Sequence, residues 1–472
     1  MKKMTRASLQ TIILLLAVFV IGCASTSPNS KNGPNHQYEK STDTVHVSKI
    51  NAVEKYPFPQ DFDSDAYKYR TGIPHKQIVN FIENDENDSL RQNETERYVT
   101  NLTSLIDSVA KNDFEKVKMI YDALALLLDY DSESYISNSQ PPSKWDYVLA
   151  SRKAVCEGYA NAFKKLCDML KIPCETVHGY ARGLTHIPAN EEITSNHAWN
   201  IVKIDKFWYN VDCTWGSSAF NVNTSKSNHR YTTDWLFLKG DHFGYSHFPN
   251  DSNHQLTKKI SRDEFKNRPL LDPIFFDLFE SPNKLQAINN IDSSYQLDLI
   301  QKRDAKFILN VYNLQTNQPV QNRALLTHNR EKLQIEFQAP YAGIFQAFLM
   351  HNVKDNAYSS IASFSISANK ASNIQHPTYF RSSAKDIKIE SPLVQLHADS
   401  TYEFKIKVSN KKYALLFCNG KKNRLKNQGN GFFSKKIKIP SNAIEVLIEV
   451  SDTEHGRYEA IAKYPVTNNA NF

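Results

Sequence analysis

The sequence predicts an α+β protein in which a unit of mixed helices and strands is followed by two β-sandwich domains. Two segments, residues 113–128 and the residues after Cys156, carry apolar side chains at helical spacing. Strand-like patterns follow at residues 175–180, 197–204 and 207–215. The last third of the chain consists of short alternating strands separated by polar turns, and it contains an internal repeat.

The composition is that of a soluble globular protein with several domains. The chain has 472 residues, of which 40 % are hydrophobic and 23 % are charged. Its formal net charge is +7, and three of the positive charges (Lys2, Lys3 and Arg6) lie in a predicted leader, which leaves +4 on the remainder. Such a weak bias does not favour nucleic acid or an acidic substrate as a partner.

The N-terminus has the pattern of an export signal. Basic residues precede an apolar run, Ile12 to Ile21, that is too short for a comfortable membrane span. The ending VIGC resembles the lipobox of bacterial lipoproteins. This resemblance implies a signal peptide at 1–22 and a lipidated Cys23, which would anchor the protein in the inner or outer membrane of a cell envelope. A plain secretory signal or an uncleaved anchor is the alternative. Residues 23–55 have the polar composition of a flexible tether.

Two helices are expected in the first unit. The first spans 113–128 and can be capped by Asn112 or Asp113. The second begins just after Cys156 and is ended by Pro173. One face of the second helix is apolar and is formed by Tyr159, Phe163, Leu166 and Leu170.

The repeat lies in the C-terminal third. The segments YSSIASFSI (358–366) and YEAIAKYPV (458–466) share the pattern Y-x-x-I-A-x-[FY]-x-[IV] at an offset of 100 residues, and Pro340 and Pro440 keep the same offset. Two units of about a hundred residues with short strands fit tandem β-sandwiches of immunoglobulin-like type. One irregular β-domain with a chance match is the alternative.

Cys156 is the candidate nucleophile because it lies at the N-terminus of its helix. There the free backbone N–H groups and the positive end of the helix dipole stabilise a thiolate. A nucleophilic thiol also needs a base, and the base needs an orienting acceptor. His197 in NHAWNIVKI and Asp212 in FWYNVDCTWG are the candidates for these two roles.

The spacing of these two residues allows them to meet on one sheet. If Asp205-Lys206 is a two-residue hairpin turn, His197 lies opposite Thr214, and Asp212 is two residues away on the neighbouring strand. An offset of two keeps both side chains on one face, about 7–8 Å apart at Cα, whereas a slip of one residue would separate them. Trp199 then lies on the same face and can shield the pair from water.

The motifs resemble a known superfamily. AVCEGYANAFKKLCDMLKIPCETVHGYARG, NHAWNIVKI and WYNVDCTWG, in this order, resemble the transglutaminase-like superfamily of papain-type cysteine enzymes. The continuation DWLFLKGDHFGYSHFP at 234–249 is similar to its kyphoscoliosis-peptidase-like branch. The resemblance covers residues 110–270 well and the β-region loosely. It implies that Cys156 is the nucleophile, that His197 is the general base and acid, and that Asp212 orients the histidine.

The resemblance also implies a papain/transglutaminase-like core, in which the cysteine helix packs against an antiparallel sheet that carries the other two residues. With the repeat, it divides the chain into five parts: a signal peptide (1–22), a tether (23–55), a transglutaminase-like cysteine peptidase domain (56–272) and two β-sandwiches (273–372 and 373–472).

The oxyanion donors are expected close to the nucleophile. The backbone N–H of Cys156 is one donor. Relatives place an aromatic or amide side chain as the second donor, and Tyr130 and Trp145 are the candidates for it. The sequence departs from the family at His254, where Trp is usual, but this position lies outside the triad.

The other cysteines have simpler interpretations. Cys167 lies on the apolar helix face and is expected to pack as a small hydrophobic residue. Cys174 begins the following strand, and a Cys167–Cys174 disulfide is an alternative in an exported protein. Cys213 is expected to point away from the triad face, and Cys418 to lie in a core. Because no C-x-x-C or H-x-x-x-H pair is present, we expect no metal, no cofactor and no thiol–disulfide exchange activity.

The sequence therefore predicts an envelope-anchored cysteine enzyme that acts on amide bonds of a protein or peptide through a thioester at Cys156. His178 and His186 are rival bases, but neither precedes a strand pair that ends in a suitably placed acid. A peptidase or amidase is favoured over a cross-linking transglutaminase because nothing specifies an amine-acceptor site or calcium ligands. The alternative from another class is a binding or scaffolding lipoprotein whose β-sandwiches engage a protein or a glycan. The sequence leaves the substrate, the acyl acceptor, the membrane leaflet and the oligomeric state open.

Overall fold

The computed structural model describes residues 55–61, 63–137, 139–182, 192–221, 226–282, 284–328, 331–354, 357–380 and 387–467. The predicted signal peptide, Cys23 and nearly all of the tether lie outside these residues. The chain divides into two compact units, Met1–Asp277 with Ser359–Ala362, and Leu278–Tyr358 with Ser363–Phe472. Along the described residues, the helices are all too short or too polar to cross a membrane.

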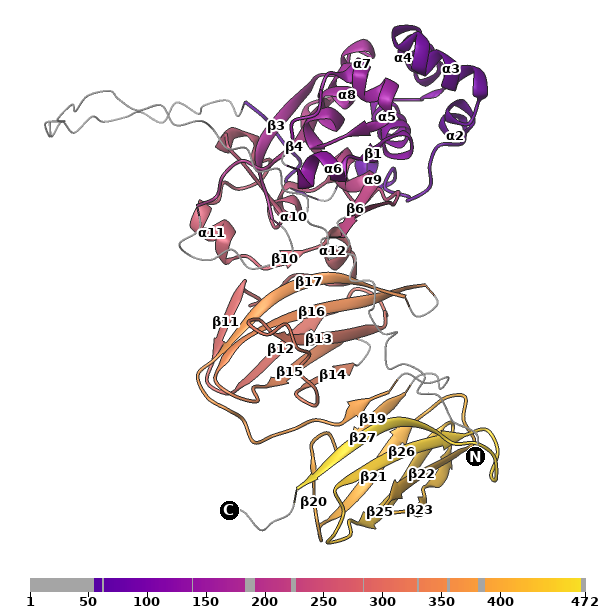
Figure 1. Cartoon of the computed structure of the whole chain (residues 1–472), viewed down its shortest axis with the longest axis vertical. Helices are drawn as coiled ribbons and strands as arrows, with labels where there is room; N and C mark the ends of the chain where they lie inside the picture. The colour runs from indigo at the N-terminus through magenta and orange to yellow at the C-terminus, as the bar shows by residue number, and fades with distance from the viewer. Residues whose placement is uncertain are drawn as a thin grey trace, which may run out of the picture. The chain divides into compact units, whose positions relative to one another are not determined.

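The first unit is α+β (Figure 1). Its helices are α1 (Ser64–Tyr67), α2 (Lys76–Ile82), α3 (Asp85–Asn93), α4 (Thr95–Val109), α5 (Asp113–Leu127), α6 (Ser132–Ile136), α7 (Trp145–Ser151), α8 (Cys156–Met169), α9 (Cys213–Ser217), α10 (Gly240–Phe243), the 3-10 helix η1 (Ser252–His254), α11 (Arg262–Asn267) and α12 (Pro273–Leu278). Its strands are β1 (Asp129–Tyr130), β2 (Lys153–Ala154), β3 (Cys174–Ala181), β4 (His197–Ile204), β5 (Phe207–Val211), β6 (Ser218–Asn221), β7 (Lys226–His229), β8 (Leu236–Leu238), β9 (His247–Pro249) and β10 (Leu270–Leu271).

Both predicted helices are confirmed. The side chain of Asn112 caps α5 by accepting a hydrogen bond from the backbone N–H of Glu115 at 3.0 Å. Helix α8 has Cys156 as its first residue and ends at Met169, before Pro173 is reached. The chain turns at Lys171, whose φ of +58° is left-handed.

The main sheet of this unit has the strand order β8-β5-β4-β3-β9, and its neighbouring strands are antiparallel. Helix α8 packs against β3 and β4 and also contacts α5. Helix α8, which begins at Cys156, therefore lies on the antiparallel sheet, as the resemblance implied.

The predicted hairpin register is confirmed, but the second strand is shorter than expected. Strand β4 pairs with β5 from Ile204↔Phe207 to Asn200↔Val211, which requires the predicted two-residue turn. The prediction of a strand up to residue 215 is wrong, because α9 begins at Cys213. One Asp212 carboxylate oxygen, Oδ1, accepts the backbone N–H of Trp215 at 3.0 Å and bends the chain into this helix. His197 consequently has no strand partner at Thr214.

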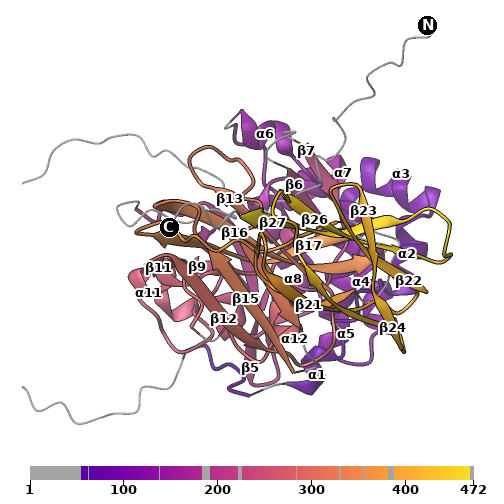
Figure 2. The same cartoon turned by 90° about the horizontal axis from the view of Figure 1, so that it is seen from below.

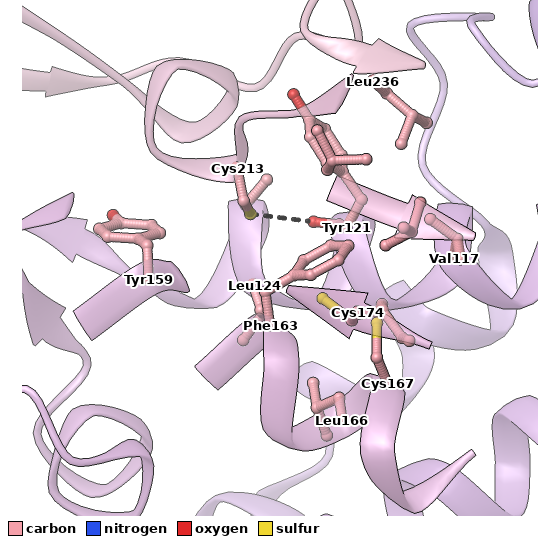
Figure 3. Packing of buried hydrophobic residues seen from close by; sticks show 14 of the residues in the cluster. Val117, Tyr121, Leu124, Tyr159, Phe163, Leu166, Cys167, Cys174, Cys213 and Leu236 are labelled. Carbon is pink, nitrogen blue, oxygen red and sulfur yellow. Dashed lines mark hydrogen bonds between the residues drawn. The ribbon is translucent and has the colours of Figure 1, made fainter. Parts of the chain in front are cut away.

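The core of the first unit lies between α5, α8 and the sheet. Figure 3 shows Val117, Tyr121 and Leu124 of α5 beside Phe163 and Leu166 of α8.

All of the cysteines in this core are buried free thiols. Cys167 and Cys174 lie in the apolar cluster, as predicted for Cys167. Burial raises the pKa of the Cys167 thiol well above its usual range, and the neighbouring Cys174 adds to this shift. Cys213 points into the same core, where its thiol lies 3.8 Å from the carbonyl oxygen of Tyr121.

The second unit contains two β-sandwiches, whose strands can be followed in Figure 1 and in the turned view of Figure 2. The strands of the first are β11 (Ile288–Ile291), β12 (Ser294–Ile300), β13 (Phe307–Asn313), β14 (Ala324–His328), β15 (Lys332–Gln338), β16 (Gly343–Lys354) and β17 (Ala357–Ala368). The strands of the second are β18 (Thr378–Tyr379), β19 (Lys388–Ser391), β20 (Leu396–His397), β21 (Thr401–Lys407), β22 (Tyr413–Cys418), β23 (Lys421–Arg424), β24 (Lys426–Gly429), β25 (Phe432–Lys438), β26 (Glu445–Ser451) and β27 (Glu459–Thr467).

The two sandwiches are built alike. In the first, the sheet β17-β16-β13 faces the sheet β12-β15-β14, and Phe337 and Phe345 meet between them at 5.1 Å. In the second, β27-β26-β22 faces β21-β25-β24, and Phe404 and Tyr464 meet at 5.8 Å. The repeated sequence segments fall on β17 and β27, which are the last strands of their sandwiches. Each also has a short parallel partner, β11 or β20. Cys418 is buried in the second core, as expected.

Candidate active site

Cys156 lies where helix α8 meets the sheet. It is the first helical residue, after the extended Val155, and only 3 % of it is exposed. Its side chain packs with Ala160, one turn along the helix, and with Ala198 of β4, the residue after His197. The first N–H groups of a helix have no partner within the helix, so this end of α8 favours a negative charge.

His197 and Asp212 form a buried hydrogen-bonded pair. His197 is the first residue of β4, and Asp212 follows the last residue of β5. The ring Nε2 of His197 lies 2.8 Å from the carboxylate Oδ2 of Asp212, and neither side chain is exposed. The other ring nitrogen, Nδ1 of His197, is buried and has no hydrogen-bond partner. Because Nε2–H donates to the carboxylate, the neutral ring carries its lone pair on Nδ1.

The carboxylate of Asp212 is held ionised. Burial alone would raise its pKa, but the charge and hydrogen bond of His197 and the hydrogen bond of His247 outweigh burial. The pKa of Asp212 is consequently well below its usual range. An ionised carboxylate can orient the imidazole of His197 and stabilise the imidazolium form during proton transfer.

His247 is a member of the site that the motif analysis missed. It is the first residue of β9, and its Nε2 lies 3.1 Å from the same Oδ2 of Asp212. Its Nδ1 lies 2.8 Å from the hydroxyl of Ser246. Burial lowers the pKa of His247 to about 4, although the hydrogen bond and charge of Asp212 oppose this shift. In the sequence, His247 is marked only by its place in GYSHFP, the end of the segment that carries the family resemblance.

Aromatic rings enclose the two histidines. Trp199 lies on His197 with a centroid distance of 6.1 Å and an interplanar angle of 25°, so it covers the face that the register predicted. The ring of His247 contacts Trp199, Trp215, Trp235 and Phe243. These rings keep bulk water from the carboxylate, and a lower local polarity strengthens its hydrogen bonds.

The two candidates for the second oxyanion donor lie in different places. Tyr130 is buried in β1, where it pairs with Ala154 of β2, two residues before Cys156. Trp145 is the first residue of α7, and its ring lies 4.8 Å from Nζ of Lys165, which is nine residues beyond Cys156 in α8.

Two further histidines considered in the sequence, His178 and His254, have hydrogen-bond partners other than Asp212. His178 is exposed and pairs with Glu157 at 2.8 Å. His186 lies outside the described residues. His254 is in η1, where its Nε2 lies 3.2 Å from the hydroxyl of Tyr56.

Within the part of the chain that the structure describes, one group of side chains is compact enough to bind a metal ion. The nearest ligand atoms of His197, Asp212 and His247 all lie within 4.8 Å of one another. The same atoms are already joined by hydrogen bonds at 2.8 and 3.1 Å, and a metal ion would have to displace both Nε2 protons from Oδ2. We therefore interpret the group as a proton-holding network rather than a metal centre.

The comparison with protein families agrees with this core. Residues 100–213 match the transglutaminase-like superfamily. The first unit contains a transglutaminase-like domain. Cys156, His197 and Asp212 all lie within the matched residues, whereas His247 lies beyond them.

Curated relatives extend the similarity of the transglutaminase-like domain. The chain is 24 % identical over 264 residues to kyphoscoliosis peptidase of Mus musculus, covering 55 % of this chain and 39 % of the relative. It is 26 % identical over 212 residues to the Lim and transglutaminase domain protein ltd-1 of Caenorhabditis elegans, covering 41 % of this chain and 29 % of the relative. The chain thus spans about two fifths or less of the length of these relatives.

A solved structure described as a TGase matches 32 % of the chain and 38 % of its own length, at 21 % identity and a TM-score of 0.21.

Proposed function

We propose that the protein is a cysteine peptidase or amidase that acts through Cys156, His197 and Asp212. The observation that supports this most is the His197–Asp212 pair, which is fully buried and leaves Nδ1 of His197 available for a proton. A cysteine nucleophile requires such a base near its thiol, and the packing of Cys156 against Ala198, the residue after His197, supports this arrangement. The match to the transglutaminase-like superfamily supports the same chemistry.

The proposed reaction has two halves. The thiolate of Cys156 attacks the carbonyl carbon of an amide, a C–S bond forms, and the carbonyl oxygen becomes an oxyanion. The oxyanion collapses, the C–N bond breaks, and Nδ1–H of His197 gives its proton to the leaving amine. Water then attacks the thioester and gives a proton to Nδ1 of His197, and the C–S bond breaks to release a carboxylic acid and restore the thiolate.

Tyr130 is our candidate for the second oxyanion donor. It is supported by the β1–β2 pairing, which fixes Tyr130 beside Ala154, two residues before Cys156. The ring of Trp145 instead rests against Lys165.

We further propose that the enzyme is anchored in a cell envelope through a lipidated Cys23 and acts there on a protein or peptide. The N-terminal sequence motif supports this proposal. In this arrangement the β-sandwiches serve to bind a protein or a glycan of the envelope.

Alkylation of the full-length protein with an iodoacetamide probe tests the nucleophile. We expect one rapidly labelled residue at pH 7, located at Cys156 by peptide mass. Cys156→Ala should abolish the label, whereas Cys418→Ser, which removes a buried thiol of the other unit, should leave it unchanged. If Cys156→Ala is labelled as fast as the unaltered protein, the proposal is wrong.

The acyl acceptor is tested separately. The protein is incubated with an envelope protein extract in H₂¹⁸O that also contains a fluorescent primary amine. Hydrolysis predicts ¹⁸O in newly formed carboxylates that depend on Cys156. Incorporation of the amine instead would identify a cross-linking transglutaminase and overturn the peptidase proposal.

A further inference from the structure

We propose that His247 is a positioning residue of the active site, which holds the carboxylate of Asp212 in place for His197. The side chains then form a continuous buried chain of hydrogen bonds, Ser246–His247–Asp212–His197. This inference rests on the proposed function, because it assigns His247 a part in the same proton transfer.

The first argument is that both oxygens of the Asp212 carboxylate accept hydrogen bonds. Its Oδ2 lies 2.8 Å from Nε2 of His197 and 3.1 Å from Nε2 of His247, while Oδ1 accepts the backbone N–H of Trp215 at 3.0 Å. The side chains of all three titratable groups have no exposed surface. Three donors at fixed positions prevent the carboxylate from rotating, so the orientation of His197 is fixed as well.

The second argument is the tautomer of His247. An ionised carboxylate only accepts, so Nε2 of His247 must carry the proton that points at Oδ2. Its Nδ1 then has a lone pair, and the Ser246 hydroxyl at 2.8 Å can donate to it. The hydroxyl of the buried Ser246 has one proton and a second possible acceptor, the carbonyl oxygen of Phe243 at 3.2 Å. That oxygen already accepts the backbone N–H of Ser246 at 3.1 Å, and Nδ1 is the nearer acceptor. Because Nε2–H donates to Asp212 and Nδ1 accepts from Ser246, His247 is a hydrogen-bond donor to the carboxylate and not a second base.

The third argument is the sheet that brings the two histidines together. His197 on β4 pairs with Gly179 of β3, and His247 on β9 pairs with Ala181 of β3. Between the two histidines, the intervening strand therefore presents a glycine and an alanine on this face. The two imidazole rings can approach across these small residues to a centroid distance of 5.4 Å. Larger side chains on β3 would keep them apart.

The surroundings of His247 favour this role over a structural one. Its charged or titratable neighbours are Asp212 and His197. Phe243 stacks on it at 4.0 Å and 16°, and tryptophan rings close the other sides. The low polarity keeps the ring neutral, since burial lowers the pKa of His247 to about 4. Because the neutral ring of His247 carries no charge, it forms no ion pair with Asp212, and the charge of the carboxylate is left to stabilise a protonated His197.

Two substitutions of His247 distinguish the effect of its N–H donor from the effect of its aromatic ring. His247→Phe keeps an aromatic ring against Phe243 but removes the N–H donor. His247→Gln loses the ring but keeps an N–H donor at a similar reach. The rate of Cys156 alkylation by iodoacetamide is measured in the full-length protein from pH 4 to 9, with circular dichroism as the check on folding.

We expect His247→Phe to lower the alkylation rate at pH 7 by about 10- to 100-fold and to change its pH profile. Loss of a hydrogen-bond partner that orients a functional side chain has effects of that size. His247→Gln should remain within about threefold of the unaltered protein. Ser246→Ala, which leaves Nδ1 of His247 without its donor while Asp212 still accepts from Nε2, should fall between them. His254→Gln is the matched control and should change nothing, since His254 bonds to Tyr56 and Glu175 instead.

The inference is overturned if folded His247→Phe keeps the pH profile of the unaltered protein, or if His247→Gln loses as much as His247→Phe. Should His247→Phe fail to fold, His247→Gln and Ser246→Ala decide the question by the same profile. A ¹H–¹⁵N NMR spectrum of the histidine rings tests the inference even if Cys156 is inert, a result that would refute the proposed function alone. It must show the Nε2–H tautomer for His247, and an Nδ1–H tautomer would overturn the inference.

Discussion

Gly179 of β3 and the indole of Trp199 lie so close that no side chain fits between them. A Cβ at position 179 would lie 2.6 Å from Cη2 of Trp199 and 2.4 Å from the carbonyl oxygen of Phe248. Gly179 is also the pairing partner of His197. The glycine of the VHGYARG segment therefore allows the ring that covers His197 to lie against the sheet.

Gly179→Ala should accordingly damage both stability and reactivity. We expect a loss of about 1–3 kcal/mol in the free energy of unfolding, because the backbone carbonyl of Phe248 cannot move aside as a side-chain end can. Displacement of Trp199 should also slow alkylation of Cys156. Gly343→Ala is the control, since its Cβ would meet only ordinary contacts of 3.5 Å or more. Urea unfolding curves that coincide for both variants would refute this account of Gly179.

Stability should fall as the pH drops below 6.5, because of His247. The pKa of His247 is lowered from 6.5 to about 4 in the folded protein. Between these values the unfolded chain binds the proton and the folded chain does not, so stability is lost as the pH falls. From pH 6.5 to 4.5 this contribution amounts to about 2 kcal/mol. The lowered pKa of Asp212 acts in the same direction at still lower pH, because its stabilisation is lost only as the carboxylate is protonated.

Urea unfolding at pH 7 and pH 4.5 checks this prediction. The unaltered protein should lose about 2 kcal/mol more than His247→Gln over this range, since glutamine does not titrate. All other titratable groups are shared by the two proteins. Equal losses would mean that His247 takes up its proton in the folded state as readily as in the unfolded chain.

Asp212→Asn should leave the fold intact and inactivate the site. Both Nε2–H donors point at Oδ2, and the backbone N–H of Trp215 points at Oδ1. An amide has one acceptor oxygen, so its N–H group must face either the two histidines or the Trp215 N–H. We expect the alkylation rate of Cys156 at pH 7 to fall by a factor of about 10² to 10⁴, which is the range seen when the orienting acid of a triad is neutralised. An unchanged rate in a folded variant would show that the three residues do not act as a unit and would favour the binding and scaffolding alternative.

The buried ion pair of α5 should matter far more than an exposed pair with the same spacing. Nζ of Lys118 lies 2.5 Å from Oδ1 of Asp122, and their side chains are 6 % and 0 % exposed. Asp122 also accepts from the hydroxyl of Tyr231 and the backbone N–H of His75. Lys118→Met leaves this carboxylate without its cation and should cost about 3–5 kcal/mol.

Lys164→Met in α8 is the matched control. It removes the cation of an i,i+4 pair with Asp168 whose side chains are 41 % and 52 % exposed. The expected loss is at most about 0.5 kcal/mol. Chemical denaturation of the two variants should therefore give clearly separated midpoints, and equal midpoints would contradict the assignment of Lys118 to a buried network.

The elements of the candidate site that depend on local pattern were predictable from the sequence. The two-residue turn at Asp205-Lys206 sets the β4–β5 register, and strand alternation then places His197 and Trp199 on one face. The helical spacing after Cys156 predicted α8 and the burial of Cys167. These predictions succeeded because each depends on residues that are near neighbours in the sequence.

Two features could not be predicted from the sequence: the helix α9 and the presence of His247 in the site. Alternation alone cannot show that Asp212 will bond the N–H of Trp215 and convert the end of the predicted strand into α9. His247 joins the site only because β9 pairs with β3, a contact between residues more than sixty positions apart. A pairing of that range leaves no local periodicity in the sequence.

The parallel pairing of β11 with β17 has a mechanical consequence. These are the first and last strands of their sandwich, and they are joined from Ile288↔Ser365 to Ile291↔Ala368. Tension applied to the two ends of this sandwich would pull parallel strands in opposite directions along their length. Their hydrogen bonds would then be loaded together rather than broken one after another, which is the geometry that resists extension best. Pulling on the ends of this sandwich would therefore load the whole β11–β17 register, from Ile288 to Ile291, at once.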